Sequence, residues 1–348
     1  MDNDQPTVSV IIPVFNTARW LPECLESVLN QTLKDIEVIC VDDCSTDPEC
    51  RRIILDYQHK DSRIIPLFLE KNGKQGIARN RGFAIARGRY AYFLDSDDYI
   101  LPETLEKAYD AAEKNALDVL FFDYDIIFDE SLQNPVTVSQ QRPENEEEYA
   151  GSVISGEKLL EEFLSHNAWI CYVQKQFWRT EYLRENDVHF LYCEHEDEYF
   201  SLTGIMLAKR AMYIKDRLFI RRFRADSVMT KPVGPTNAHG YLVNVMQLIR
   251  FSRVHGVTSQ AFQNNCRSLT RRFVACYNQL QDKEQLAGWF RDPDERDFYE
   301  WFLLVWQVGG ASRCNECRLK KTLKPLLQIR RWAINIFKHV RNAVVRKQ

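Results

Sequence analysis

The chain has 348 residues, of which 45% are hydrophobic and 27% are charged, and its formal net charge is −3. This is an ordinary globular balance, large enough to bury a core without disulfide bonds or a structural metal, and the net charge gives no indication of a nucleic-acid partner. We read no signal peptide at the N-terminus and no apolar run near 18 residues, so we expect a cytoplasmic chain with reduced cysteines.

The first 125 residues alternate between strand and helix patterns. Residues 8–14 form a continuous, largely β-branched apolar run, as expected of a strand buried on both faces. The other expected strands are 36–41, 64–69, 90–94 and 119–122, and the expected helices are 21–29, 51–57, 77–86 and one opened by Pro102. This alternation predicts an α/β fold with a mostly parallel central sheet and flanking helices.

The rest of the chain is less regular. Residues 126–150 are polar and predict a loop, residues 151–225 mix helix and strand signals, and residues from about 238 onward are helical in pattern. We therefore divide the chain into an α/β domain over residues 1–235 and a mostly helical C-terminal region over residues 236–348.

Polar side chains follow three of the predicted strands, where parallel α/β sheets bind their ligands. These are Asn16, then Asp42 and Asp43, then Asp95, Asp97 and Asp98. Clustered carboxylates repel one another and favour a hard divalent cation, Mg²⁺ or Mn²⁺. The alternative is that the aspartates only cap turns and helices.

Neither common phosphate-binding loop is present. The first strand is not followed by G-x-G-x-x-G, no G-x-x-x-x-G-K-[ST] occurs, and Gly73, Gly76 and Gly82 have the wrong spacing for either. This argues against dehydrogenases and P-loop enzymes. We expect that a metal and basic side chains neutralise the charge of a bound phosphate instead.

Six segments together resemble the family 2 glycosyltransferases, whose catalytic domain has the Rossmann-like GT-A fold. They are VSVIIPVFN (8–16), SVLNQT (27–32), IEVICVDDCSTD (36–47), GIARNRGFAIARGRYAYFLDSDD (76–98), EDEYF (196–200) and RRFRADSVMT (221–230). The resemblance covers about the first 230 residues, so residues 1–235 are expected to be the catalytic domain.

The resemblance implies a role for each matching residue. Pro13, Phe15 and Asn16 would line the nucleoside pocket, Asp43 would contact the uracil edge, and Arg79 would lie near ribose or diphosphate. Asp95 and Asp97 form the D-x-D element, in which Asp97 would bind Mn²⁺ or Mg²⁺ beside Asp98, and Asp197 would be the general base. Arg224 and Ser227 belong to a segment resembling the family's flexible loop over donor and acceptor.

Two positions depart from the family pattern. The family usually has glycine where Cys44 stands, and often an acidic residue where Ala18 stands. Both lie near the nucleoside-binding segments, so they bear on donor identity more than on the reaction.

Inverting transfer is a direct displacement that needs a base and positive charge for the leaving diphosphate. Asp197 fits the first role, and a metal on Asp97, helped by Arg79 or Arg224, fits the second. The start of a helix at Asp197 would lower its basicity, whereas Glu194, Glu196 and Glu198 would raise it. The alternative is that this acidic string only begins a helix.

Residues 318–348 contain many lysines and arginines and no acidic residue. A helix over residues 326–345 would be basic and amphipathic, which favours binding to a membrane surface, the alternative being packing on the domain. Cys314 and Cys317 lack a second pair for zinc, and the Q-x-x-R-W string at 328–332 is read as coincidental.

These observations predict an inverting hexosyltransferase that moves one sugar from a UDP-sugar to a saccharide or lipid-linked saccharide. The expected pathway is lipopolysaccharide, O-antigen or capsule synthesis at the cytoplasmic face of the inner membrane. The alternatives are a metal-dependent sugar nucleotidyltransferase and a non-catalytic nucleotide-sugar or glycan-binding protein of the same fold.

Overall fold

The structure is a computed structural model that describes residues 5–131, 149–225, 233–290 and 292–310. The chain divides into two compact units, Met1–Trp289 and Phe290–Gln348. Within the described part of the second unit there is one helix, α11 (Pro293–Gly310). The predicted division after residue 235 falls inside the first unit, because α8 (Pro235–His255) packs on α7 (Glu196–Leu207) and on the loop before it.

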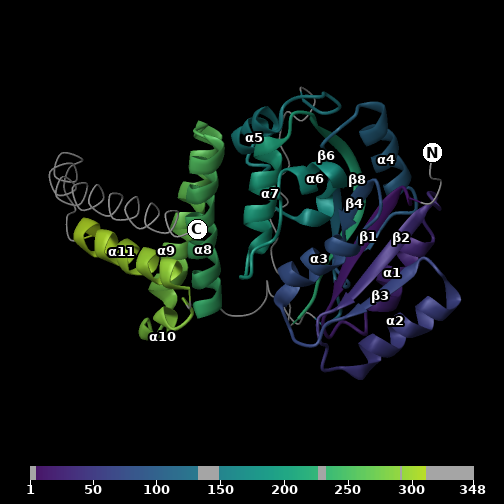
Figure 1. Ribbon diagram of the computed structural model, residues 1–348, viewed down its shortest axis with the longest axis horizontal. Coiled ribbons are helices and arrows are strands. Elements are labelled where there is room, and N and C mark those ends of the chain that lie inside the picture. Colours follow the sequence, from purple (N-terminus) through teal and green to yellow (C-terminus); the bar gives the residue numbers. More distant parts are fainter. Residues whose placement is uncertain (1–4, 132–148, 226–232, 291, 311–348) are drawn as a thin grey trace, which may run out of the picture. The chain divides into compact units, whose positions relative to one another are not determined.

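The first unit is built on one eight-stranded sheet with the order β3-β2-β1-β4-β7-β6-β8-β5 (Figure 1). The strands are β1 (Val8–Val14), β2 (Ile36–Asp42), β3 (Ile64–Phe68), β4 (Tyr90–Phe93), β5 (Tyr99–Ile100), β6 (Val119–Phe128), β7 (Gln176–Arg179) and β8 (Ala211–Phe223). Strands β1 to β4 pair in parallel, as do β6 and β8, whereas β7 and the short β5 are antiparallel to their neighbours. The predicted α/β class is confirmed.

Helices cover both faces of this sheet because successive strand residues point to opposite sides. Val8, Val10 and Ile12 point into a core shared with α1 (Leu21–Leu29), α2 (Pro48–Lys60) and α4 (Thr104–Lys114). On the other face Ile11 and Val41 lie against Gly82 of α3 (Lys74–Ile85), and Phe93 meets Phe200 of α7.

The remaining helices of the first unit follow β6 along the chain. They are α5 (Gly156–Ser165), the 3₁₀ turn η2 (Val173–Lys175), α6 (Thr180–Glu185), α7, α8, α9 (Gln260–Gln279) and α10 (Glu284–Ala287). The helical pattern predicted beyond residue 238 is confirmed as far as residue 310.

Two sequence expectations need correction. Pro102 does not open a helix: it lies in the turn before α4, where the Thr104 amide donates to the Leu101 carbonyl. The strand expected at 119–122 is only the first part of β6, which continues to Phe128 because it pairs with the long β8 across a bulge near Asp123.

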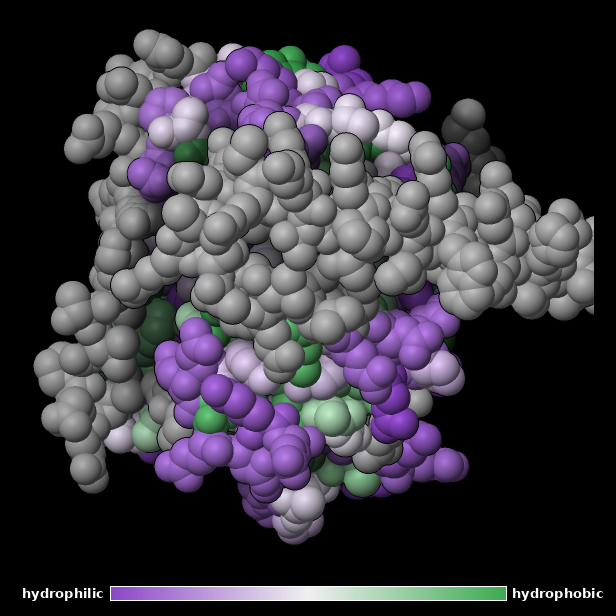
Figure 2. Space-filling view, turned by 90° about the vertical axis from the view of Figure 1, so that its left-hand side faces the viewer, coloured by the Kyte–Doolittle hydropathy of each residue, from purple (hydrophilic) through white to green (hydrophobic). Residues whose placement is uncertain are grey.

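No helix in the described ranges is long and apolar enough to cross a membrane. On the face that Figure 2 shows, the described atoms are mainly hydrophilic, with hydrophobic residues scattered among them. Scattered hydrophobic residues of this kind are common on protein surfaces and do not by themselves mark an interface.

Candidate active site

Three aspartates gather in the turn that follows β4. Asp95 and Asp97 are partly buried, Asp98 is buried, and one carboxylate oxygen of each lies within 4.8 Å of the others. Burial raises the pKa of Asp97 and of Asp98, and repulsion by the neighbouring carboxylates raises both further. Hard oxygen ligands that repel one another fit a divalent cation such as Mn²⁺ or Mg²⁺.

The neighbouring elements hold these carboxylates in place. Gln75 Nε2 on α3 donates to Asp95 Oδ1 at 2.6 Å, and the Arg222 amide donates to Asp98 Oδ1 at 2.7 Å. Arg224 Nε donates to Asp97 Oδ2 at 2.6 Å, and its guanidinium lies 4.5 Å from the ring of Trp20. The end of β8 is thus brought against the end of β4, and Arg224 adds positive charge beside the cluster.

Arg79 on α3 joins this cluster to the start of α7. Its Nη2 atom donates to Asp95 Oδ1 and its Nη1 atom to Glu196 Oε1, both at 2.6 Å, and the residue is only 2% exposed. Arg79 therefore positions the turn after β4 and the start of α7 relative to each other. The predicted contact of Arg79 with ribose or diphosphate stays a prediction, since the described contacts are all internal.

Asp197 is the second residue of α7 and is partly buried. The Cys171 thiol donates to its Oδ2 atom at 3.3 Å. Burial, followed by the charge of Glu198, raises the pKa of Asp197 to about 6, although Arg79 opposes the shift. Burial and the negative charge of Glu198 therefore raise the pKa of Asp197 more than the start of α7 lowers it. Asp197 is suited to accept a proton near neutral pH.

Helix α8 supports the chain just before α7. His195 takes a left-handed conformation (φ 61°) at the N-cap, stacks on Tyr241 at 4.1 Å, and accepts a hydrogen bond from Asn244 Nδ2 at its carbonyl. Gly240 is required here, because an added Cβ would lie 2.1 Å from the Glu194 carbonyl oxygen. Burial lowers the pKa of His195 to about 4, so it is a neutral packing residue.

Asp42, Asp43 and Asn16 shape the loops that follow β1 and β2. Asn16 Oδ1 accepts from the Thr46 and Asp47 amides at 2.9 and 3.1 Å. Asp42 Oδ1 accepts from the Ser45 amide at 2.9 Å, and the buried Asp43 Oδ1 accepts from the Gly73 amide at 2.7 Å.

The five carboxylates that were expected to gather at one edge of the sheet therefore form two separate groups, Asp42 with Asp43 and Asp95 with Asp97 and Asp98. Asp42 and Asp43 cap turns, which is the alternative that the sequence left open. Among the described residues, the potential cation site consists of the other three aspartates. Burial raises the pKa of Asp43, with the Gly73 amide opposing the shift.

The apolar residues at the end of β1 differ in accessibility. Pro13 is buried in β1 opposite Val41, whereas Phe15 is 45% exposed and available to a ligand. Cys44 has a φ of 60°, the left-handed conformation that favours the glycine usual at this position in the family.

Several predictions lie outside the described residues. These are the donor contact of Ser227, the basic helix at 326–345, Cys314 with Cys317, and the Q-x-x-R-W string. Sequence reasoning also missed Cys171, the hydrogen-bond donor to Asp197, and the support from α8, for which a glycine and an asparagine inside a helical pattern were the only signals.

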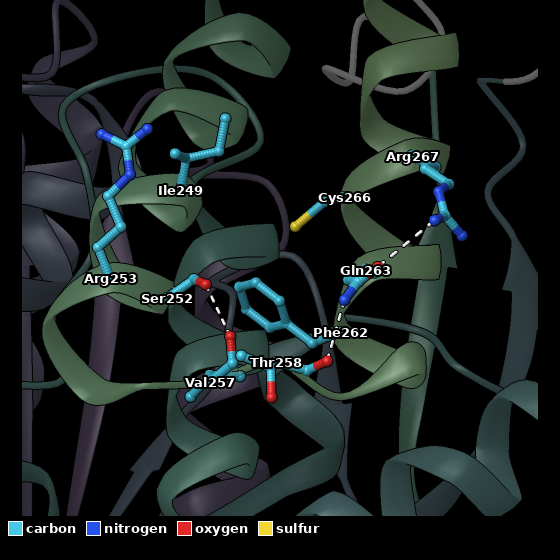
Figure 3. A pocket seen from close by; sticks show the side chains of 9 residues that line it. All are labelled: Ile249, Ser252, Arg253, Val257, Thr258, Phe262, Gln263, Cys266 and Arg267. Carbon is cyan, nitrogen blue, oxygen red and sulfur yellow. Dashed lines mark hydrogen bonds between the residues drawn. The ribbon is translucent and has the colours of Figure 1, made fainter. Parts of the chain in front are cut away.

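A cavity of about 310 Å³ lies away from this site, between α8 and α9 (Figure 3). Ser252 Oγ donates to the Val257 carbonyl and Gln263 Nε2 to the Thr258 carbonyl, so these polar groups are satisfied within the hairpin. We assign it no ligand.

Residues 9–168 match the family model described as glycosyl transferase family 2. The glycosyltransferase GlyG of Streptococcus pneumoniae serotype 4 (strain ATCC BAA-334 / TIGR4) is 30% identical over 64% of this chain and 72% of its own length. The uncharacterized glycosyltransferase EpsJ of Bacillus subtilis (strain 168) is 31% identical over 66% of this chain, and the match spans 65% of EpsJ, just under two thirds.

A third relative is more distant but longer in its match. The poly(ribitol-phosphate) beta-glucosyltransferase of Bacillus spizizenii (strain ATCC 23059 / NRRL B-14472 / W23) is 26% identical over 82% of this chain and 44% of its own length.

Solved structures share the fold at low sequence identity. S. aureus TarS 1–349 in complex with UDP-GlcNAc superposes with a TM-score of 0.59 at 23% identity, over 84% of this chain and 78% of that one. The mannosyltransferase PcManGT from Pyrobaculum calidifontis, in complex with GDP-Man and Mn²⁺, gives 0.51 at 16% identity, over 93% and 81%. These likenesses show a GT-A-like fold.

Proposed function

Because the chain belongs to glycosyltransferase family 2, we propose that it is an inverting, metal-dependent hexosyltransferase that moves one sugar from a UDP-sugar to a saccharide acceptor. The observation that carries the proposal is the bridge made by Arg79. One buried guanidinium ties the three-aspartate cluster, through Asp95, to the acidic start of α7, through Glu196. Arg79 thereby links the potential cation site to the helix that carries the candidate base, Asp197.

Asp197 would act as the base of the displacement. An inverting transfer removes a proton from the acceptor hydroxyl as that oxygen attacks the anomeric carbon and the nucleoside diphosphate leaves. A carboxyl group whose pKa is raised to about 6 is mostly ionised at pH 7, yet more basic than an ordinary aspartate. The neighbouring thiol of Cys171 orients it through the hydrogen bond to Oδ2.

Asp95, Asp97 and Asp98 would hold Mn²⁺ or Mg²⁺. When bound, the ion supplies positive charge for the diphosphate oxygens of the donor. Arg224 contributes further positive charge from the end of β8. The nucleotide sugars in the TarS and PcManGT complexes, and the Mn²⁺ in the latter, support this class of donor and cofactor.

The proposed acceptor is a saccharide, free or lipid-linked, in the synthesis of a surface glycan such as lipopolysaccharide, O-antigen or capsule. Relatives named as a poly(ribitol-phosphate) beta-glucosyltransferase and as a putative teichuronic acid biosynthesis glycosyltransferase support a cell-surface polymer. We further propose that the enzyme is cytoplasmic and binds the inner membrane through the basic residues 318–348. This part of the proposal is supported by the charge pattern of these residues alone.

Thermal unfolding with a panel of nucleotides tests this function. UDP, UDP-sugars, GDP-sugars and nucleoside triphosphates are each added with and without Mn²⁺ to the wild type and to Asp97→Ala. Ligand at a hundred times its dissociation constant adds about 2.7 kcal/mol to the native state. We expect a Mn²⁺-dependent increase in melting temperature with UDP and UDP-sugars that the variant lacks.

The other outcomes have distinct meanings. A shift confined to nucleoside triphosphates would indicate a nucleotidyltransferase, and a shift confined to GDP-sugars would overturn the proposed donor. Stabilisation by no nucleotide at all would refute an active transferase. Asp216→Asn is the matched control, because Asp216 is an exposed partner of Lys107.

A further inference from the structure

Three arginines stand at the end of β8, and two of them are paired with carboxylates. Arg222 pairs with Glu23 and lies 3.8 Å from Asp129, and Arg224 pairs with Asp97 at 2.6 Å. Alternation along the strand puts Arg221 on the opposite face of the sheet from Arg222. Arg221 does not share the Glu23 carboxylate that Arg222 binds, and contacts aromatic rings instead.

Aromatic rings fix the position of the Arg221 guanidinium. Its central carbon lies 3.7 Å from the centroid of the Tyr172 ring and 5.1 Å from that of Phe223. Tyr172 directly follows Cys171, the residue whose thiol donates to Asp197. The guanidinium is thus held against the segment that contacts the candidate base, in a conformation set by stacking.

Arg221 lacks a counter-ion in the described part of the chain. No described carboxylate oxygen lies within 4.0 Å of its guanidinium, and Nη1 is buried with no hydrogen-bond partner. Asp95, Asp98 and Asp197 are close enough to interact with its charge, but they do not pair with it. A buried donor on a charged group costs free energy until an acceptor reaches it, which points to an anionic ligand.

We propose that Arg221 determines acceptor specificity by binding an anionic group, a phosphate or a carboxylate, carried by the acceptor beside the hydroxyl that Asp197 deprotonates. The inference rests on the proposed function. The donor diphosphate has its own positively charged partners, the cation that the three aspartates would hold and Arg224, which pairs with Asp97. A planar guanidinium that already stacks on a ring is well suited to bidentate contact with either anion.

Binding of small sugar probes tests this assignment. Titration calorimetry is performed with glucose, glucuronate and glucose 6-phosphate on protein already saturated with UDP and Mn²⁺, so that the donor site is filled. The wild type is compared with Arg221→Gln, which removes the charge, and Arg221→Lys, which keeps it. Arg217→Gln is the matched control, since Arg217 lies on the same strand in an exposed pair with Asp125.

We expect the wild type to bind one of the two anionic sugars at least about tenfold more tightly than glucose, with the stronger one identifying phosphate or carboxylate. Arg221→Gln should lose this preference, Arg221→Lys should keep part of it, and Arg217→Gln should keep it fully. Equal binding of all three sugars by the wild type, or an unchanged preference in Arg221→Gln, overturns the proposal.

Two further results separate this inference from the proposed function. If Arg221→Gln weakens UDP binding as strongly as it weakens binding of the anionic sugar, Arg221 belongs to the donor site and the acceptor assignment is wrong. If the wild type itself binds no UDP in the presence of Mn²⁺, it is the proposed function that fails.

Discussion

Arg79 donates a hydrogen bond of 2.6 Å to Glu196, a residue 117 positions further along the chain. Its Nη2 atom donates a hydrogen bond to Asp95 Oδ1 at the same distance. The arginine therefore fixes the distance between the end of β4, where the aspartates gather, and the start of α7, where Asp197 stands. Since both carboxylates and the arginine are largely out of water, removing one member leaves uncompensated charge.

Replacement of Arg79 by methionine should lower the free energy of unfolding by about 3–5 kcal/mol, because Asp95 and Glu196 would face each other without a cation. Chemical denaturation measures the change. The control is Arg52→Met, which removes an exposed pair with Glu49 and should leave the free energy of unfolding nearly unchanged. If the Arg79 and Arg52 variants lose the same stability, the bridge is not the organising contact described here.

Asp197→Asn should keep donor binding and lower the rate of transfer by about 10²–10⁴-fold, as expected for loss of a general base. The same variant should be more stable at pH 7.5. The folded-state pKa of Asp197 is raised to about 6 from 3.8, so its ionised form costs stability on the order of 3 kcal/mol above pH 6. That cost is removed by asparagine and absent in the wild type below pH 4. An equal loss of donor binding and transfer would instead mark Asp197 as structural.

The rate of transfer should fall as the pH is lowered through about 6, approaching a tenfold decrease in kcat/KM per pH unit as Asp197 takes up its proton. Removal of the Cys171 thiol by Cys171→Ala takes away a hydrogen bond that favours the ionised form, so the midpoint should rise. A profile with no change between pH 5 and 7, or one unaltered by Cys171→Ala, would argue against this assignment.

Mn²⁺ alone should stabilise the protein at pH 7.5, because it relieves the repulsion among three carboxylates, and the stabilisation should shrink at pH 5.5. The pKa of Asp97 and that of Asp98 are both raised by burial, so protons compete with the ion as the pH falls. Differential scanning calorimetry with and without a chelator measures the effect. Asp98→Asn should reduce it, whereas Asp56→Asn on the exposed face of α2 should not.

At Gly76, α3 approaches the start of α7 and the loop before it closely. An added Cβ would lie 2.8 Å from the Leu191 carbonyl oxygen and 2.8 Å from Glu196 Cγ, so Gly76→Ala must push the two helices apart. We expect a loss of about 1–3 kcal/mol of stability and reduced transfer with nearly normal folding. Gly288→Ala is the control, since its nearest atom would be 3.4 Å away. Full activity in Gly76→Ala would show that the spacing between α3 and α7 is not critical.

The strands and the aspartate cluster were predictable from local pattern. The apolar run at Val8–Val14 and the alternation of strands with helices specify a mostly parallel sheet, and in such a sheet residues just after the strands share one edge. Asp95, Asp97 and Asp98 therefore had to lie together once β4 was placed. The left-handed φ of Cys44 accords with the family's preference for glycine there.

What the sequence by itself determined was the α/β class, the order of the first strands and the position of the acidic turn after β4, because these follow from short-range periodicity. Only the tertiary structure decided that Asp42 and Asp43 cap turns and that Arg79 is paired with two carboxylates. It likewise decided that, within the described part of the chain, Arg221 has no carboxylate partner. It also decided that burial raises the pKa of Asp197, against the effect of its helix. These outcomes depend on which charges are desolvated together, and desolvation is a property of distant segments meeting in space, which no local pattern of residues records.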